Sequence, residues 1–223
     1  MALFARASTE WHIAPAEMRY YTYIVKRDFG FAPNPWFGYC TLATCKPNIR
    51  ASATVGNWVF GTGSKANNLN GYLIYAMKVT EKVTLNEYWN DPRFQQKKPE
   101  MFGSLKQMYG DNIYYYDPDK GIWHQSNSHH SNEDGSVNFD NLGNDTSKPC
   151  VLISSEFFYF GKDAIQIPEA FKDAFCHTTQ GHKLVRDHVL ANRFVEWLHE
   201  NFEPGIIGFP LQFKGTFVRF KGK

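Results

Sequence analysis

The sequence lacks the short motifs by which several large enzyme classes are recognised. It contains no G-x-S-x-G nucleophile elbow, no P-loop and no G-x-G-x-x-G dinucleotide fingerprint. The fragment GTGS at Gly61–Ser64 follows a predicted strand, but no helical pattern follows it, so we interpret it as a tight turn. These absences argue against the α/β-hydrolase, P-loop and dinucleotide-binding classes.

Long apolar segments are also missing, and cysteines are few. No run approaches the roughly 18 apolar residues that span a bilayer, and the first residues, MALFARASTEW, lack the apolar stretch of a secretory signal. We therefore expect a cytoplasmic protein without membrane contact, whose four cysteines are free thiols. Cys40 and Cys45 have no matching Cys or His pair at zinc-site spacing, so neither a metal site nor a cofactor is predicted.

Aromatic side chains, in contrast, are abundant, at 17% of the chain. They build a core, or some of them line a pocket for a flat or cationic ligand, and composition leaves both open. Charge is unevenly distributed although the net charge is only +2. Residues 19–82 carry eight basic and two acidic side chains, and residues 83–147 carry ten acidic and five basic ones. An anionic partner of the first segment explains this asymmetry, and so does internal ion pairing.

Hydrophobic patterning predicts strands early in the chain, short helices between them and a long helix late. The expected strands are 20–26, 41–46, 56–65, 71–83 and 151–161, with two more around a turn at 117–121, and the expected helices are 48–54, 84–91, 167–175 and 182–202. Thr84 and Glu87 have the spacing of a capping box. The polar segment 124–149 is expected to be a long surface loop, and the basic tail 213–223 an edge strand or a loose end. This order favours an α+β fold with a mixed or barrel-like sheet.

Titratable side chains in loops are the candidate catalytic groups. They are Asp28 in the Gly- and Pro-rich loop 27–40, and His129 and His130 in the polar segment, with Asp111 and Asp145 as further acids. A pair of adjacent histidines shuttles protons or is simply solvated, and the sequence leaves both open.

A second group of residues is the candidate binding site for a base or nucleotide. A base needs ring faces to stack on and polar groups for its edge. The candidates are Arg27, Asp28, Asn34, Trp36, Phe37, Trp58, Ser64, Lys65 and Asn112, with Lys26, Lys46 and Arg50 as further phosphate contacts. The alternative for Trp58 is a place in the core.

Several long blocks of the first half resemble a known family. The stretch YIVKRDFGFAPNPWFGYCTLATCKPNIR, followed by GNWVFGTGSK, LIYAMKV, EYWNDPRF and GDNIYY, resembles the second of the nucleotide modification associated domain families. The matching blocks run from Tyr20 to Tyr116, and VLISSEFFYFG extends the match to Gly161. The resemblance implies a bacterial or phage protein associated with DNA base modification, and it carries over no reaction.

The order of predicted elements is also similar to PUA-like base readers, such as EVE, ASCH and YTH domains. That similarity implies a partly closed β-barrel with short helices and a longer C-terminal helix. We accordingly predict a single domain, 1–223, with a PUA-like core at 19–161, a polar insert at 124–149 and a helical C-terminal extension at 162–223. Asn57, where such readers often have Asp, and the long insert depart from this pattern.

Three functions follow from these features. The first is a binding module that holds a modified base or nucleotide, in DNA or RNA, in an aromatic pocket beside a basic surface. The second is an enzyme of nucleotide or DNA base modification, a transferase or hydrolase, that uses the titratable loop residues. The third is an interaction protein whose rings are core. A nucleic acid or nucleotide is therefore the expected partner.

Overall fold

The computed structural model describes residues 18–176 and 181–220. The strands are β1 (Tyr20–Val25), β2 (Cys40–Leu42), β3 (Trp58–Gly63), β4 (Tyr72–Lys78), β5 (Glu81–Thr84), β6 (Tyr114–Asp117), β7 (Ile122–Gln125), β8 (Cys150–Ser154), β9 (Glu156–Tyr159), β10 (Ile165–Gln166), β11 (His182–Val185) and β12 (Gly205–Ile206). The α-helices are α1 (Pro47–Ser52), α2 (Leu85–Asn90), α3 (Leu105–Met108), α4 (Phe139–Thr146), α5 (Glu169–Phe175) and α6 (His188–Asn201), and the 3-10 helices are η1 (Lys65–Asn67), η2 (Pro92–Lys97) and η3 (Gly161–Asp163).

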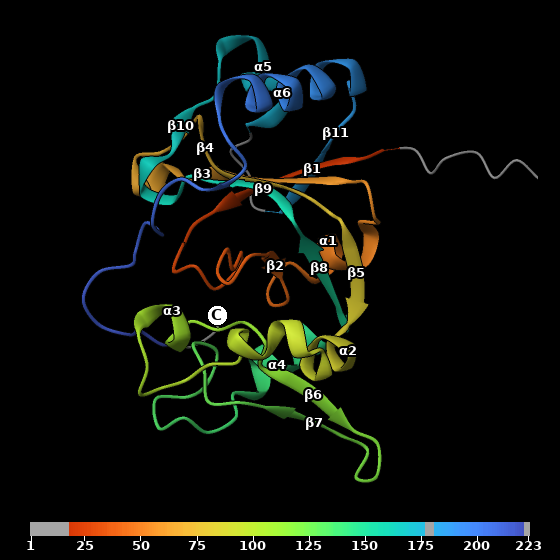
Figure 1. Cartoon of the computed structure of the whole chain (residues 1–223), viewed down its shortest axis with the longest axis vertical. Helices are drawn as coiled ribbons and strands as arrows, with labels where there is room; N and C mark the ends of the chain where they lie inside the picture. Colours follow the sequence, from red (N-terminus) through yellow and green to blue (C-terminus); the bar gives the residue numbers. More distant parts are fainter. Residues whose placement is uncertain (1–17, 177–180, 221–223) are drawn as a thin grey trace, which may run out of the picture.

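The largest sheet has the strand order β11-β1-β3-β4-β9-β12, and β10 pairs with β4 beside this path. The sheet is mixed, because β1 is parallel to β3 while β4 is antiparallel to both β3 and β9. Helices α5 and α6 cover one face (Figure 1), and their buried Phe171, Phe175 and Phe194 pack there with Trp58 and Phe60 of β3.

A second layer lies on the opposite side of this sheet. It contains the three-stranded sheet β2-β8-β5, and further out lie α2, α3, α4 and the β6–β7 hairpin (Figure 1). The described strands form separate sheets and no closed barrel, so the barrel of the PUA-like prediction is not confirmed. The mixed α+β class is confirmed.

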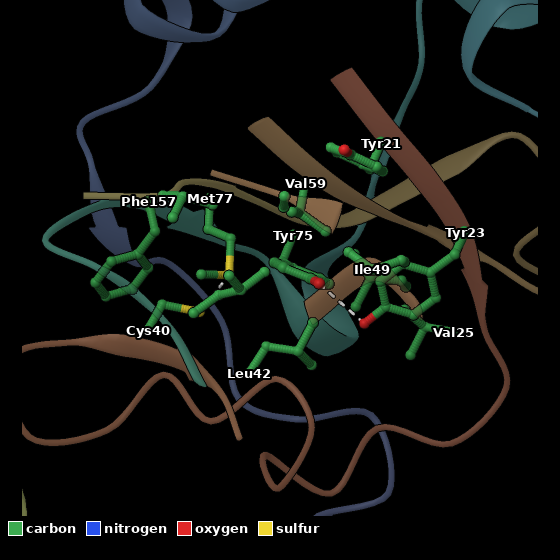
Figure 2. Close-up of a cluster of buried hydrophobic side chains, with 14 of the residues drawn as sticks. Tyr21, Tyr23, Val25, Cys40, Leu42, Ile49, Val59, Tyr75, Met77 and Phe157 are labelled. Atoms are coloured by element: carbon green, nitrogen blue, oxygen red, sulfur yellow. Dashed lines mark hydrogen bonds between the residues drawn. The ribbon is translucent and has the colours of Figure 1, made fainter. Parts of the chain in front are cut away.

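The core between the two layers holds the turn that precedes α1. Leu42 of β2 and Ile49 of α1 are both fully buried in one apolar cluster with Tyr23, Tyr75 and other side chains of the large sheet (Figure 2). Tyr75 donates a hydrogen bond from its hydroxyl to that of Tyr23, at 2.9 Å. Because buried side chains anchor it on both sides, the turn at residues 43–46 has little freedom to move.

Most predicted elements are found, but several predictions are wrong. Each of the strands predicted at 71–83 and 151–161 divides into two, because the chain passes between the layers: β4 and β9 pair in the large sheet, and β5 and β8 pair in the three-stranded sheet. The capping box forms, with the Thr84 hydroxyl accepting from the Glu87 amide and starting α2. The polar segment is not all loop, because the Asn138 side chain caps α4. The predicted helix 182–202 begins only at His188, after the Asp187 cap, and residues 182–185 instead pair with β1 as strand β11.

The end of the chain runs back across the molecule as an irregular segment, residues 209–220, which we call the C-terminal strap. It contains no strand in its described part, so the predicted edge strand is not found there. Its backbone is held at several points. Three backbone N–H groups of the strap donate hydrogen bonds. That of Gln212 donates to the Asp28 carbonyl at 2.9 Å, that of Val218 to the Tyr109 hydroxyl at 2.9 Å, and that of Phe220 to the His129 carbonyl at 2.6 Å. The strap therefore joins the loop 27–40 to the polar segment.

Candidate active site

Cys45, His130 and Asp145 meet in the second layer, although they are far apart in sequence. The Cys45 Sγ lies 3.7 Å from His130 Nε2, and His130 Nδ1 lies 2.8 Å from Asp145 Oδ2. We call this group the Cys45–His130–Asp145 triad. A thiol, an imidazole that contacts it and a carboxylate that orients the imidazole form the arrangement that activates a nucleophile.

Cys45 sits at the sharp turn between β2 and α1. Both Cys45 and Lys46 have left-handed backbone conformations, with φ of 56° and 40°. Such conformations are uncommon outside glycine and cluster at functional sites. The Cys45 amide donates to Asp145 Oδ1 at 2.7 Å, which ties the strained turn to the triad carboxylate. Cys45 is half-buried, while His130 and Asp145 are buried.

Arg50 ties together the segments that carry the triad. Its side chain is fully buried and donates to four backbone carbonyls: Cys45 at 2.8 Å, Lys148 at 2.9 Å, Cys150 at 2.6 Å and Asp145 at 2.6 Å. One guanidinium thus bridges the Cys45 turn, the end of α4 and the start of β8. Arg50 was predicted to face phosphates, and its burial leaves it no surface for that role.

The triad favours a charged imidazole. Burial disfavours the charged form of His130, but Cys45 and Asp145 outweigh burial and raise its pKa to about 10. Burial also acts on Asp145, where His130 and Arg50 outweigh it and lower the pKa of the carboxyl. In cysteine nucleophiles, the imidazole that contacts the sulfur serves as its proton acceptor.

The Asp145 carboxylate is saturated with hydrogen bonds. Besides His130 and the Cys45 backbone amide, it accepts from the Tyr114 hydroxyl at 3.0 Å and from the side-chain Nδ2 of Asn144 at 3.2 Å. The ligand atoms of the triad lie within 4.8 Å of one another, which a metal ion could use, although no metal site was predicted. However, His130 directs opposite ring nitrogens at the sulfur and the carboxylate. A metal ion on Cys45 Sγ and Nε2 would leave the hydrogen bond between Nδ1 and Asp145 in place, as in many metal sites. Two protein ligands are fewer than the three or four of zinc sites, so the geometry fits a triad better.

Aromatic rings enclose the imidazole of His130. Phe31 lies 4.7 Å from the ring of His130, and Phe220 of the C-terminal strap lies 5.5 Å from it, measured between centroids. The Arg27 guanidinium stacks over Phe220 at 4.6 Å. Low polarity around the imidazole strengthens its interaction with Asp145.

His129 is held apart from this chemistry. Its Nδ1 bonds to the Val218 carbonyl of the strap at 2.5 Å, and its ring packs on Phe29 and Phe31. Burial, together with the neighbouring His130, lowers the pKa of His129 to about 3. The structure therefore places His129 as a neutral side chain that anchors the strap, while its neighbour joins the triad.

Asp28, the other catalytic candidate, also anchors the strap. Its carboxylate accepts from the Tyr159 hydroxyl, from the Gly30 amide at 3.3 Å and from the Leu211 amide at 3.0 Å. Burial raises the pKa of Asp28. Asp111 is likewise internal, because Tyr88 and Thr41 donate to it at 2.8 and 2.7 Å.

The candidate binding residues do not converge on one pocket. Trp36 and Trp58 are each 2% exposed and belong to opposite layers, Trp36 against Phe209 and Phe213, and Trp58 against Phe60. Asn34 and Asn112 are buried and bond to backbone carbonyls of Tyr109, Tyr88 and Phe94. Phe37 is half-buried, Ser64 is buried, and Lys65 is exposed as the first residue of η1. The aromatic pocket for a base remains a prediction.

The comparison with protein families accounts for nearly the whole chain. The family model for nucleotide modification associated domain 2 matches residues 17–217. The chain belongs to this family. Membership confirms the resemblance to this family drawn from the sequence and extends it into the C-terminal strap, to residue 217, and it connects the domain with nucleotide modification. The comparisons find no matching curated protein and no matching solved structure.

The described part of this nucleotide modification associated domain has no helix with the length and apolar character needed to cross a bilayer. Sequence reasoning weighed Cys45 only as a metal ligand and missed it as a nucleophile. The available signal was a cysteine combined with a histidine and an acid elsewhere in the chain. That signal is weak because spacing along the chain does not reveal which of four cysteines and eight histidines meet.

Proposed function

We propose that this domain is an enzyme of nucleotide modification that uses Cys45 as a covalent nucleophile. The observation that carries the proposal is the Cys45–His130–Asp145 triad, with 3.7 Å between sulfur and imidazole and 2.8 Å between imidazole and carboxylate. The family's association with nucleotide modification supports a nucleotide or nucleobase as the substrate class. Of the functions considered from the sequence, the enzyme gains this support, whereas Trp36 and Trp58 lie in the interior instead of lining a base-reading pocket.

The chemistry divides into two steps. In the first, the Cys45 thiolate forms a bond to an electrophilic carbon of the substrate, and the His130 imidazolium gives its proton to the atom or leaving group that receives the electron pair. In the second, water or an acceptor group loses a proton to neutral His130 and displaces the sulfur. Asp145 orients the imidazole and stabilises its charge throughout. Water as the acceptor makes the enzyme a hydrolase, and a second substrate makes it a transferase.

The reactivity of Cys45 is the first test. The intact protein is treated with limiting iodoacetamide at pH 7, and the alkylation of each cysteine is followed by peptide mass spectrometry. We expect Cys45 to react at least tenfold faster than Cys150 and Cys176, and His130→Gln to remove this advantage while the control His182→Gln, an exposed histidine, does not. A Cys45 that reacts no faster than Cys150 refutes the proposal.

Turnover is the second test, and it separates an enzyme from a reader. Pools of unmodified and modified deoxynucleotides, and duplex DNA carrying the same bases, are incubated with the protein and with Cys45→Ser, and masses are compared. A mass change that depends on Cys45 supports the enzyme. Saturable binding with an unchanged ligand supports the base-reading module instead. Zinc bound stoichiometrically and lost in Cys45→Ser would make the triad a metal site.

A further inference from the structure

Two side chains of the β6–β7 hairpin connect the backbone to the carboxylate of the triad by a series of hydrogen bonds. The backbone amide of Asn138 donates to Gln125 Oε1 at 2.8 Å, and Gln125 Nε2 donates to the Tyr114 hydroxyl at 3.1 Å. That hydroxyl donates to Asp145 Oδ2 at 3.0 Å. Tyr114 and Gln125 lie opposite each other in the hairpin, and we call them the Gln125–Tyr114 pair. Neither was a candidate from the sequence.

The backbone fixes the direction of each of these hydrogen bonds. Because a backbone N–H can only donate, Gln125 turns its Oε1 to Asn138 and its NH2 group to Tyr114. The same NH2 group donates to the His130 carbonyl at 3.2 Å. The Tyr114 oxygen therefore accepts from Gln125, and its single proton points to Asp145. Tyr114 is fully buried, and burial together with the charge of Asp145 raises the pKa of its hydroxyl well above the usual value, so this proton stays in place.

Tyr114 and His130 donate to the same carboxylate oxygen. Asp145 Oδ2 lies 2.8 Å from His130 Nδ1 and 3.0 Å from the Tyr114 hydroxyl, whereas Oδ1 accepts from the backbone amide of Cys45 at 2.7 Å. A second donor on an oxygen takes up part of its negative charge, so less of that charge acts on the imidazole. Although burial lowers the pKa of His130, Cys45 and Asp145 raise it to about 10, and the Tyr114 hydroxyl opposes the contribution of Asp145.

An imidazolium that holds its proton too firmly is a poor general acid, because proton transfer is most effective when the pKa of the group lies near the working pH. In the proposed reaction, His130 has to release its proton to the atom that receives the electron pair. We propose that Tyr114 is a positioning residue that acts through Asp145: its hydroxyl holds Oδ2 in place and limits the negative charge that acts on His130, which keeps the imidazolium able to donate its proton. This role in catalysis rests on the proposed function, whereas the effect of Tyr114 on His130 is testable without it.

Other charged and titratable groups surround the imidazole of His130, and the test has to hold them constant. They are Cys45 of the β2–α1 turn, with Sγ 3.7 Å from Nε2; His129, with ring centroids 5.7 Å apart; Arg50 of α1, which donates to the Asp145 carbonyl; and Arg27, which stacks on the Phe220 ring beside the imidazole. Among the groups that raise the pKa of His130, Cys45 contributes most. Replacing its thiol therefore brings the titration of His130 to a lower pH and removes the nucleophile from the measurement.

The test is a pH titration of the full chain carrying Cys45→Ser, followed by NMR of isotope-labelled histidine rings, with the His130 signal assigned by its loss in His130→Gln. Adding Tyr114→Phe removes the hydroxyl and keeps the ring. We expect this change to raise the pKa of His130 by at least about 0.5 pH unit, because the undivided charge of Oδ2 then acts on the imidazole. Tyr116→Phe is the matched control, at an exposed position of the same strand, and should leave the pKa of His130 unchanged.

A ring-fluorinated tyrosine at position 114 provides a second variant if Tyr114→Phe does not fold. Its more acidic hydroxyl donates a stronger hydrogen bond, so it should lower the pKa of His130. A pKa of His130 that stays the same or falls in folded Tyr114→Phe, or that rises with the fluorinated ring, would overturn the assignment, since a hydroxyl with a purely structural role changes only the stability. A shift of the expected sign alongside an unreactive Cys45 keeps the action of Tyr114 on His130 and removes the proposed enzyme. A hyper-reactive Cys45 without the shift leaves the nucleophile and removes the role of Tyr114.

Discussion

Replacing Asp145 by Asn should strongly slow the alkylation of Cys45 while the protein still folds. The amide oxygen of Asn can still accept from the Cys45 backbone amide, which lies 2.7 Å from Oδ1. The amide NH2 would then face His130 Nδ1, which lies 2.8 Å from Oδ2. This reverses the hydrogen bond, so that Nδ1 becomes an acceptor and the proton moves to the nitrogen that faces the sulfur. A neutral histidine of that tautomer cannot serve as the base.

The magnitude follows from the protonation of His130. Its pKa of about 10 makes the imidazole almost fully charged at pH 8. Without the Asp145 charge the pKa falls toward the ordinary value near 6.5, where only about 3% is charged at that pH. Burial lowers this pKa further while Cys45 raises it, so the charged fraction falls by about thirtyfold. We expect at least a tenfold slower alkylation of Cys45 at pH 8, and a loss of about 2–4 kcal/mol in the free energy of unfolding.

The assay is site-resolved alkylation by iodoacetamide, with Cys150 in the same protein as the internal reference. Asp140→Asn on the same helix is the matched control, because Asp140 is exposed in the first turn of α4. Urea unfolding of both variants separates the loss of reactivity from the loss of stability. An Asp145→Asn protein that folds and alkylates Cys45 within twofold of the native rate would refute the triad.

Three further predictions concern the framework of the site. Gly30→Ala should lower the free energy of unfolding by about 1–3 kcal/mol. Gly30 has φ of +68°, and a new Cβ would lie 2.7 Å from Pro210 and 2.9 Å from Trp36. A urea denaturation midpoint equal to that of the native protein would contradict this. Lys97 is buried, and burial lowers its pKa to about 8, so the unfolded chain keeps the proton that the native state loses above that pH. The stability advantage of the native protein over Lys97→Met should therefore grow between pH 8 and 10, by up to about 1.4 kcal/mol per pH unit, and a constant difference in urea titrations would argue against it. Thr84→Ala removes the cap of α2 and should cost about 1 kcal/mol in the same titrations, while Thr84→Ser should cost little.

Local sequence patterns anticipated the elements that local forces determine. The apolar and aromatic stretch beginning at Tyr20 predicted β1, and the pairing of Thr84 with Glu87 predicted the start of α2. The family was also recognised from contiguous blocks of sequence. Prediction was wrong for residues 182–185, because pairing with β1 decided their conformation and no pattern within the segment encodes that partner.

At the candidate site, the tertiary structure decides even more than it does for the secondary structure. Composition and motifs named His130 and Asp145 among several titratable residues, but nothing in their spacing distinguished them from Asp28 or His129. Only the tertiary structure brings the β2–α1 turn and the polar segment together, through the buried Arg50 that bonds to the carbonyls of both. Burial then separates two adjacent histidines, raising the pKa of one to about 10 and lowering that of the other to about 3. Sequence determines which groups are present, whereas their distances and their exclusion from water, which set their chemistry, arise from the packing of segments that are remote along the chain.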